Sequence, residues 1–142
     1  GNTEGCFRIL STGVLELIQK LDYEKTQLYF LIIQATDGVY NTTSQCFISV
    51  SAVNEHTPSF ADPAVTVHVE ENVPANTFVY TAIANDSDAG PDGVVRYSIG
   101  PGPFVIGSQT GVVSVVGRLD RESVPYYNLT VLAVDQGTVA KT

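Results

Sequence analysis

The sequence predicts an all-β fold of β-sandwich repeats in tandem, because it combines an internal duplication with a strand-like alternation of apolar residues. Residues 12–37 return as residues 110–135 at a constant offset of 98, the separation of Thr12 and Thr110. A gapless period of this length matches one whole β-sandwich, whereas helical and propeller repeats recur at roughly 20 to 50 residues. No segment holds a helical period of 3.6 for long.

The positions shared by the two copies are mostly apolar or acidic. Thr12, Gly13, Val14, Leu21, Asp22, Glu24, Tyr29, Leu31, Ala35 and Asp37 return as Thr110, Gly111, Val112, Leu119, Asp120, Glu122, Tyr127, Leu129, Ala133 and Asp135. Because these carboxylates repeat in register with the predicted strands, each is expected to occupy the same structural position in both repeats. Acid repeated at the ends of repeats suggests a bound cation.

The first copy is expected to form strands over residues 28–33 and 44–53. By alternation, Cys46 shares the inward face with Ile48 and Val50. The polar residues 54–58 then mark a boundary, because they end in proline between two apolar runs.

The two cysteines leave a disulfide open. Cys6 precedes the inward pair Phe7 and Ile9, so alternation points Cys6 outward. If the two side chains point to opposite faces of their strands, the Cα atoms are not expected to lie within the ~7 Å that a disulfide allows, which argues against a Cys6–Cys46 bridge. An extracellular compartment would favour the bond.

The second copy is expected to form strands over residues 65–69, 95–99 and 126–133. In the last of these, Tyr127, Leu129, Val131 and Ala133 occupy the core face. The seven prolines fall between apolar runs, as turn residues do.

The predicted domains are residues 1–53, a linker at 54–58, and residues 59–142. Aligning the copies leaves the first without a counterpart of 60–103, and the second without a counterpart of 44–53. Both repeats are therefore expected to be incomplete.

Composition narrows the class of partner. With 7 basic and 15 acidic residues, the net charge of -8 argues against nucleic acid and against anionic membranes. The apolar runs are far shorter than the ~20 residues that cross a bilayer, so no direct membrane insertion is expected.

Several motifs, in order, resemble the extracellular cadherin repeat over essentially the whole chain. They are Asn54-Glu55-His56, Glu71-Asn72, the loop 86–93, Val95 with Tyr97, residues 104–106, Thr110-Gly111, residues 119–122 and residues 133–135. The Glu-His linker is most similar to the long Fat, Dachsous and protocadherin-related members. The resemblance implies Greek-key, immunoglobulin-like sandwiches that bind Ca²⁺ between successive repeats.

The family pattern implies a set of calcium ligands. One group would comprise Asp22, Glu24, Glu55, Asp88 and the carbonyl of Val53. A further ion would be held by Asn54, Asp86, Asp88 and Asp135, with the carbonyls of His56 and Asp92. Asp37 would serve a preceding junction, and Glu71, Asp120 and Glu122 a following one.

The linker departs from the usual Asp-x-Asn-Asp-Asn. Ala52 removes an acidic group, which predicts some weakening, whereas Glu55 keeps a carboxylate on a longer arm. The loop that starts at Asp86 does not match an EF-hand, because its sixth and twelfth positions hold Pro91 and Tyr97 in place of glycine and glutamate.

The resemblance implies a calcium-rigidified spacer or tether without catalysis, in the extracellular part of a single-pass cell-surface adhesion protein. Its partners would be other cadherin ectodomains, homophilic or heterophilic. The main alternative is a calcium-dependent carbohydrate-binding β-sandwich module, and a glycosidase is a more distant one, since duplicated carboxylate pairs do not make a single active site.

Three triplets match the glycosylation sequon, at Asn41, Asn85 and Asn128. Asn128 alternates outward and Asn41 is expected in a turn, so both are predicted acceptors. Asn85 adjoins the predicted ligand Asp86 and is expected to stay unmodified.

Overall fold

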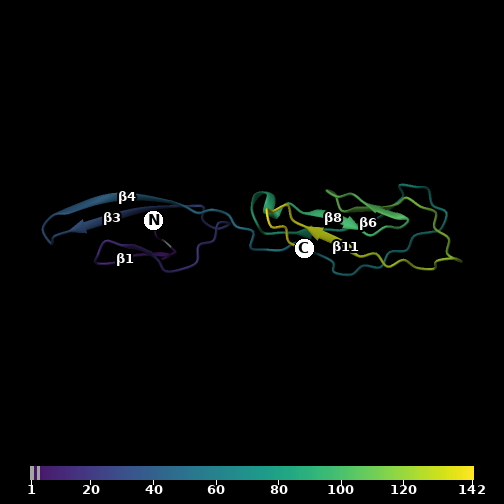
Figure 1. Ribbon diagram of the computed structural model, residues 1–142, viewed down its shortest axis with the longest axis horizontal. Coiled ribbons are helices and arrows are strands. Elements are labelled where there is room, and N and C mark those ends of the chain that lie inside the picture. Colours follow the sequence, from purple (N-terminus) through teal and green to yellow (C-terminus); the bar gives the residue numbers. More distant parts are fainter. Residues whose placement is uncertain (1, 3) are drawn as a thin grey trace. The chain divides into compact units, whose positions relative to one another are not determined.

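The computed structural model describes residues 2 and 4–142 and confirms the all-β prediction (Figure 1). The chain divides into two compact units, the first unit Gly1–Val53 and the second unit Asn54–Thr142. Across the described chain, one short 3-10 helix, η1 (Gly90–Gly93), is the single helical element. No helix among these residues has the length and apolar character to span a membrane.

The first unit packs two antiparallel strand pairs against each other. β1 (Phe7–Ile9) pairs with β2 (Leu15–Leu17), and β3 (Leu28–Thr36) pairs with β4 (Asn41–Ser49). Figure 1 shows the β3–β4 hairpin as a layer separate from β1. The core between them consists of Cys6, Phe7, Tyr29 and Leu31, with Leu15, Leu21, Cys46, Ile48 and Val50 packed against it. The predicted inward face of Cys46, Ile48 and Val50 is thereby confirmed.

The predicted orientation of Cys6 is wrong. Cys6 is buried at 3% exposure, whereas Ile9 is 47% exposed. The cause is local: Gly5 has φ 68° and β1 begins only at Phe7, so the strand alternation does not extend back to Cys6. Both thiols are free and border the same core, so the argument from opposed parity against a disulfide no longer holds.

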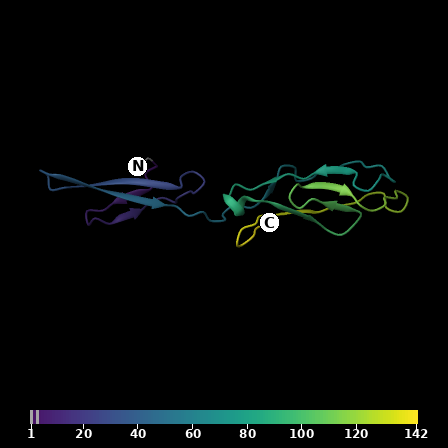
Figure 2. The same ribbon diagram turned by 90° about the horizontal axis from the view of Figure 1, so that it is seen from above.

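The second unit is built from short strands in three sheets, seen from above in Figure 2. The strands are β5 (Ser59–Phe60), β6 (Phe78–Thr81), β7 (Ala84–Asn85), β8 (Arg96–Ile99), β9 (Phe104–Ile106), β10 (Val112–Val115) and β11 (Val131–Val134). The sheets have the orders β6-β10-β9, β11-β8 and β5-β7. The buried cluster Phe104, Val113, Val115 and Leu119 joins the first two of these sheets, because Val79 of β6 and Ile99 of β8 pack against it.

Two predicted strands of the second copy differ from the structure. Residues 65–69 form no strand, and only Val69 packs against the core. Residues 126–130 are also irregular, and β11 starts at Val131. Tyr127 is 37% exposed but its ring meets that of Phe104 edge to face, with ring centroids 5.3 Å apart. Apolar alternation is present in both segments, but a strand also requires a neighbouring backbone to pair with.

The duplicated Thr-Gly pair has a conformational reason. Gly13 has φ 83° and Gly111 has φ 68°, a region that other residues rarely adopt. In both copies the glycine N–H closes a turn, donating to Leu10 O at 2.9 Å in one and to Gly107 O at 2.8 Å in the other. The duplication thus preserves a turn that leads into a strand.

Glu4 ties the start of the first unit to its hairpin. It accepts hydrogen bonds from Thr26 Oγ1 at 2.8 Å and from the Tyr29 hydroxyl at 3.0 Å. These bonds hold the pKa of Glu4 below its usual range. Burial, together with Cys6 and Glu4, raises the pKa of Tyr29 to about 12.

We expect the first unit to lose stability in acid through Glu4. A carboxyl group whose pKa is depressed by folding stabilises the fold above its unfolded pKa, and this contribution disappears as pH falls through the folded pKa. Thermal melts followed by near-ultraviolet circular dichroism, from neutral pH to below pH 4, should therefore show a steeper acid loss in the wild type than in Glu4→Gln. An equal fall in melting temperature with decreasing pH in the two proteins would contradict this role of Glu4.

Candidate metal centre

Three segments of the second unit, far apart in sequence, meet at the predicted metal ligands. They are residues 54–56, the loop 86–93, and residues 135–141. The side chain of Asp88 is 1% exposed and Asp135 is 3% exposed. Aspartate is almost never fully buried unless it is paired or coordinates a metal, so this burial requires an explanation.

The loop 86–93 folds around its own carboxylate. Asp86 Oδ1 accepts the N–H of Asp88 at 3.0 Å, which forms an Asx turn. η1 then begins at Gly90 with Pro91 in its first turn, and its end is closed by the Val94 N–H, which donates to Pro91 O at 3.1 Å. A side chain at Gly93 would overlap the carbonyl of Asp88, so the loop needs glycine there.

The linker residues fasten this loop to the end of the chain. The backbone N–H of His56 donates to Asp88 Oδ2 at 2.9 Å. The amide nitrogen of Asn54 donates to Asp135 Oδ2 at 2.9 Å and to Val139 O at 3.2 Å. Asn54, Asp88 and Asp135, predicted as ligands of one ion, therefore lie in one connected network.

Asp135 is held in its charged form. Burial alone would raise its pKa, but hydrogen bonds from Asn54 and from the backbone N–H groups of Gly137 and Lys141 together bring the pKa below its usual range. The two backbone bonds measure 2.9 Å and 3.1 Å.

Three buried oxygen atoms of this network have no hydrogen-bond donor among the described residues. They are Asn54 Oδ1, Asp86 Oδ2 and Asp88 Oδ1. The His56 Nε2 atom lies 3.9 Å from Asp88 Oδ1, too far for a hydrogen bond. An unsatisfied buried acceptor costs about 1–3 kcal/mol, and more when it is charged. All three atoms belong to predicted ligands.

The donor set fits a hard cation. Carboxylate and amide oxygens are the ligands of calcium, which takes six to eight of them, including backbone carbonyls. Neither cysteine contributes, and the single nearby imidazole is half-exposed. The arrangement can therefore bind calcium and offers nothing typical of a zinc site.

A second acidic cluster joins the other predicted ligands of this unit. One oxygen each from Glu71, Asp120 and Glu122 lies within 4.8 Å of the others. Glu71 Oε2 accepts the N–H of Arg121 at 3.1 Å, which brings residue 71 to the 120–122 turn. Asp120 Oδ1 accepts the N–H groups of Glu122 and Ser123.

In the first unit, Asp22 occupies the same kind of turn. Its Oδ1 accepts the Lys25 N–H at 3.0 Å, and its Oδ2 pairs with Lys25 Nζ at 2.5 Å, which lowers the pKa of Asp22. Glu24 and Val53 are exposed, as is Glu55 at the start of the second unit.

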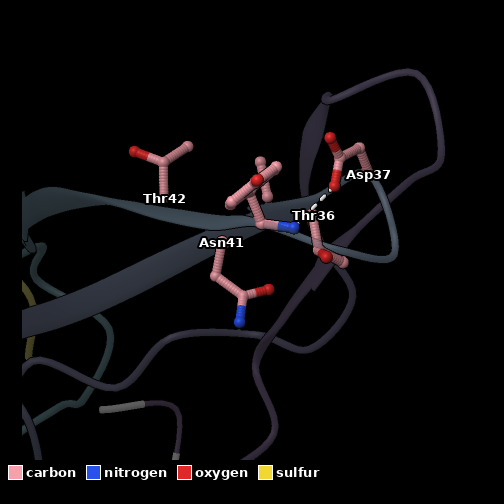
Figure 3. A pocket seen from close by; sticks show the side chains of 6 residues that line it. Thr36, Asp37, Asn41 and Thr42 are labelled. Atoms are coloured by element: carbon pink, nitrogen blue, oxygen red, sulfur yellow. Dashed lines mark hydrogen bonds between the residues drawn. The ribbon is translucent and has the colours of Figure 1, made fainter.

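Asp37 lies at the tip of the β3–β4 hairpin (Figure 3). Its Oδ1 accepts the N–H of Tyr40 at 2.7 Å and of Val39 at 2.8 Å, and these bonds hold its pKa below the usual range. Asn41 follows at the start of β4, not in the turn itself, and its amide points to the opposite side from Thr42 (Figure 3). Asn41, Asn85 and Asn128 are all exposed.

Two features of the centre were not found by sequence reasoning: the position of the Asp92 side chain and the requirement for glycine at position 137. The Asp92 side chain lies beside Asp135, although the resemblance implied only its carbonyl, and Gly137 lies directly under both. The carboxylate of Asp92 could have been suspected from its charge. The sequence gives no indication of a role for Gly137, because the duplicated pattern aligns Gly38 of the first copy with position 136.

Comparison with known proteins places these features in a family context. The cadherin domain model matches residues 65–142. Human protocadherin Fat 1 is 41% identical over 138 residues, which covers 90% of this chain but 3% of that protein. The chain therefore spans a small part of this curated relative.

Solved structures are similar as well. Mouse cadherin-23 EC22-24 has a TM-score of 0.83 at 32% identity, covering 99% of this chain and 47% of that one. The protocadherin gammaB7 EC3-6 cis-dimer structure has a TM-score of 0.83 at 30% identity, covering 96% and 36%. Both agree with an immunoglobulin-like β-sandwich architecture.

Asp86→Ala should weaken calcium binding by more than about tenfold, or about 1.4 kcal/mol. The substitution removes an orphan oxygen and also the acceptor that forms the Asx turn. His56→Ala is the matched control: it keeps the backbone N–H to Asp88 and the backbone carbonyl. Isothermal titration calorimetry with calcium chloride measures both, and comparable losses in the two variants would refute the ligand set.

We expect N-glycans on Asn41 and Asn128 and none on Asn85. Asn85 adjoins the Asx turn of Asp86, whereas Asn41 lies at the start of β4 beside the exposed hairpin tip and Asn128 lies in an irregular exposed segment. Enzymatic deglycosylation of secreted protein, followed by peptide mass spectrometry, reports each site. A glycan on Asn85 would show that the 86–93 loop is more accessible than its hydrogen bonds imply.

Proposed function

The chain belongs to the cadherin family, and on that premise we propose that it is a calcium-rigidified spacer or tether in the extracellular region of a cell-adhesion protein. The observation that carries the proposal is the set of orphan oxygens on Asn54, Asp86 and Asp88. A fold that buries three acceptors without donors is poised for a cation, and the ligand chemistry favours calcium.

The proposed mechanism is mechanical, without catalysis. Without the ion, the carboxylates of Asp86, Asp88 and Asp135 repel one another, because like charges in a poorly hydrated site are weakly screened. Bound calcium would convert that repulsion into attraction and hold the 54–56 linker against the 86–93 loop. Participation of Asp22, Glu24 and Val53 in such a site stays a prediction from the sequence.

The cluster Glu71, Asp120 and Glu122 supports a second calcium site in the same unit. Its three carboxylates come together although residues 71 and 120 are far apart in sequence. Two proposed ion-binding regions in one unit would suit a spacer that is one link in a series.

We propose that its partners are other cadherin ectodomains. The similar protocadherin gammaB7 structure is a cis-dimer, which supports association between chains of this kind. The net charge of -8 favours neither nucleic acid nor an anionic membrane.

The alternative, a calcium-dependent carbohydrate-binding module, has one point in its favour. Tyr40 is 77% exposed beside Asp37, and sugar sites place aromatic rings next to an ion. However, Asp37 Oδ1 already accepts two backbone N–H groups, and the family match supports adhesion.

Calcium should bind in the range of about 10⁻⁴ to 10⁻³ M, as it does to other extracellular modules. Small-angle X-ray scattering across a calcium titration should show a narrower distribution of interatomic distances as the ion binds, reversed by a chelator. Magnesium at equal concentration is the control, because it tolerates irregular geometry poorly.

Three outcomes separate the proposals. If calcium binds but the scattering does not change, the spacer role is refuted while the calcium site remains supported. Undetectable binding would refute both. Retention on immobilised oligosaccharides only in calcium would favour the carbohydrate-binding module.

A further inference from the structure

The outer face of the β3–β4 hairpin, turned away from the core of the first unit, carries four large apolar side chains. Leu28, Phe30 and Ile32 alternate on this face of β3, and Phe47 lies opposite Phe30 on β4. Leu28, Ile32 and Phe47 are 58%, 63% and 66% exposed, whereas Phe30 is partly buried. The rings of Phe30 and Phe47 pack together with their centroids 4.9 Å apart. These four side chains form a contiguous exposed group, the outer patch.

The duplicated sequence shows that the repeat does not itself require this patch. At an offset of 98 residues the core positions of β3 keep their identity, but Phe30 and Ile32 are replaced by Asn128 and Thr130. The large apolar side chains on the outer face are therefore particular to the first unit. Contiguous exposed apolar groups of this kind mark interaction surfaces, whereas single exposed apolar residues are ordinary.

The absence of charge on this face favours a second molecule of the same chain as the occupant. Positions 28, 30, 32, 34 and 36 of β3 lie opposite positions 49, 47, 45, 43 and 41 of β4, and none of them is acidic or basic. The net charge of the chain is -8, so contacts between two molecules elsewhere tend to bring like charges together. A contact across the uncharged face avoids that repulsion, and a strongly basic partner would find no carboxylate on it.

The arrangement of the patch suits a two-fold contact. Leu28 and Ile32 lie on either side of Phe30 along β3, each about 6.6 Å from it. A two-fold axis near the Phe30–Phe47 pair would set Leu28 of one molecule against Ile32 of the second molecule, which is the self-complementarity that an isologous interface requires.

The size of the patch predicts a weak association. Scaled by their exposures, the four side chains offer on the order of 400 Å² of apolar surface. Two molecules would therefore bury roughly 800 Å² of it, below the 1,200–2,000 Å² of stable complexes, and a polar rim adds to this.

We propose that the outer patch of Leu28, Phe30, Ile32 and Phe47 is a surface through which two molecules of this chain associate. The inference rests on the proposed association between cadherin ectodomains, for which it names the partner and the surface. Asn41 lies on the same face, but six residues along β4 from Phe47, or about 20 Å. A glycan on Asn41 would therefore border the patch and leave it open.

Sedimentation velocity of the full chain at about 1 to 300 µM tests the proposal in the concentration range of weak complexes. The wild type should shift reversibly from monomer to dimer, equally in calcium chloride and in a chelator, because the patch contains no carboxylate. Ile32→Thr introduces the residue type of the second copy and keeps a β-branched side chain. It should weaken the association by at least roughly tenfold, since each substitution acts twice in a two-fold contact.

Phe47→Thr is a second test on the other strand of the patch and should have an effect of the same size. Val39→Thr is the matched control, because it also removes exposed apolar surface, from a residue that is 77% exposed at the hairpin tip and outside the patch. It should change the dissociation constant less than about twofold.

A wild type that stays monomeric over the whole range, or an equal loss in Val39→Thr, would overturn the proposed surface. Dimers that form only in calcium would also overturn it, because the contact would then depend on bound ions. A monomeric wild type that binds a different cadherin ectodomain would retain the proposed class of partner and overturn the second molecule as occupant. Calcium titration of the same wild type tests the spacer separately, so the failures are distinguishable.

Discussion

The second unit is organised around three buried oxygen atoms that lack hydrogen-bond donors among the described residues. Asn54, Asp86 and Asp88 each bury an oxygen without a donor, although other atoms of the same side chains are hydrogen-bonded. The bonds that are made fix the three side chains in place, so the orphan oxygens cannot turn toward water without breaking them. Each unsatisfied buried oxygen lowers the free energy of unfolding by about 1–3 kcal/mol. A cation bound to the three oxygens, as proposed, would offset that cost.

The turn at Asp22 has the same backbone hydrogen bonds as the turn at Asp120, but different charged side chains lie next to the two turns. Asp22 and Asp120 each accept the N–H of the residue three positions later, and their carbonyls accept the N–H four positions later, at 2.9 Å in both copies. In the second unit Glu71 joins this turn, whereas in the first unit Lys25 pairs with Asp22. The same local motif can therefore carry concentrated negative charge or a neutralised pair, depending on which side chain reaches it.

The features that sequence could predict are those determined by near neighbours. β3, β4 and β8 follow from alternation and length, and the Thr12-Gly13 and Thr110-Gly111 turns follow from glycine. The burial of Cys6 could not be predicted, because Gly5 redirects the backbone just before the strand begins. Residues 65–69 alternate like a strand but lie where no described residue completes a ladder with them. The predicted ligands of the centre were named from a resemblance, and the packing of Asp92 over Gly137 needed coordinates.

The bond between Asn54 and Asp135 spans 81 residues, so the centre exists only when the second unit is folded. A ligand that binds the folded state alone stabilises it by RT ln(1 + [L]/Kd), which is about 1.4 kcal/mol at ten times Kd. For a site with a Kd near 10⁻³ M, such a contribution arises only at high calcium concentrations. In the proposed spacer, weak affinity would therefore make the stiffness of the unit depend on the surrounding calcium concentration, whereas a much tighter site would stay saturated.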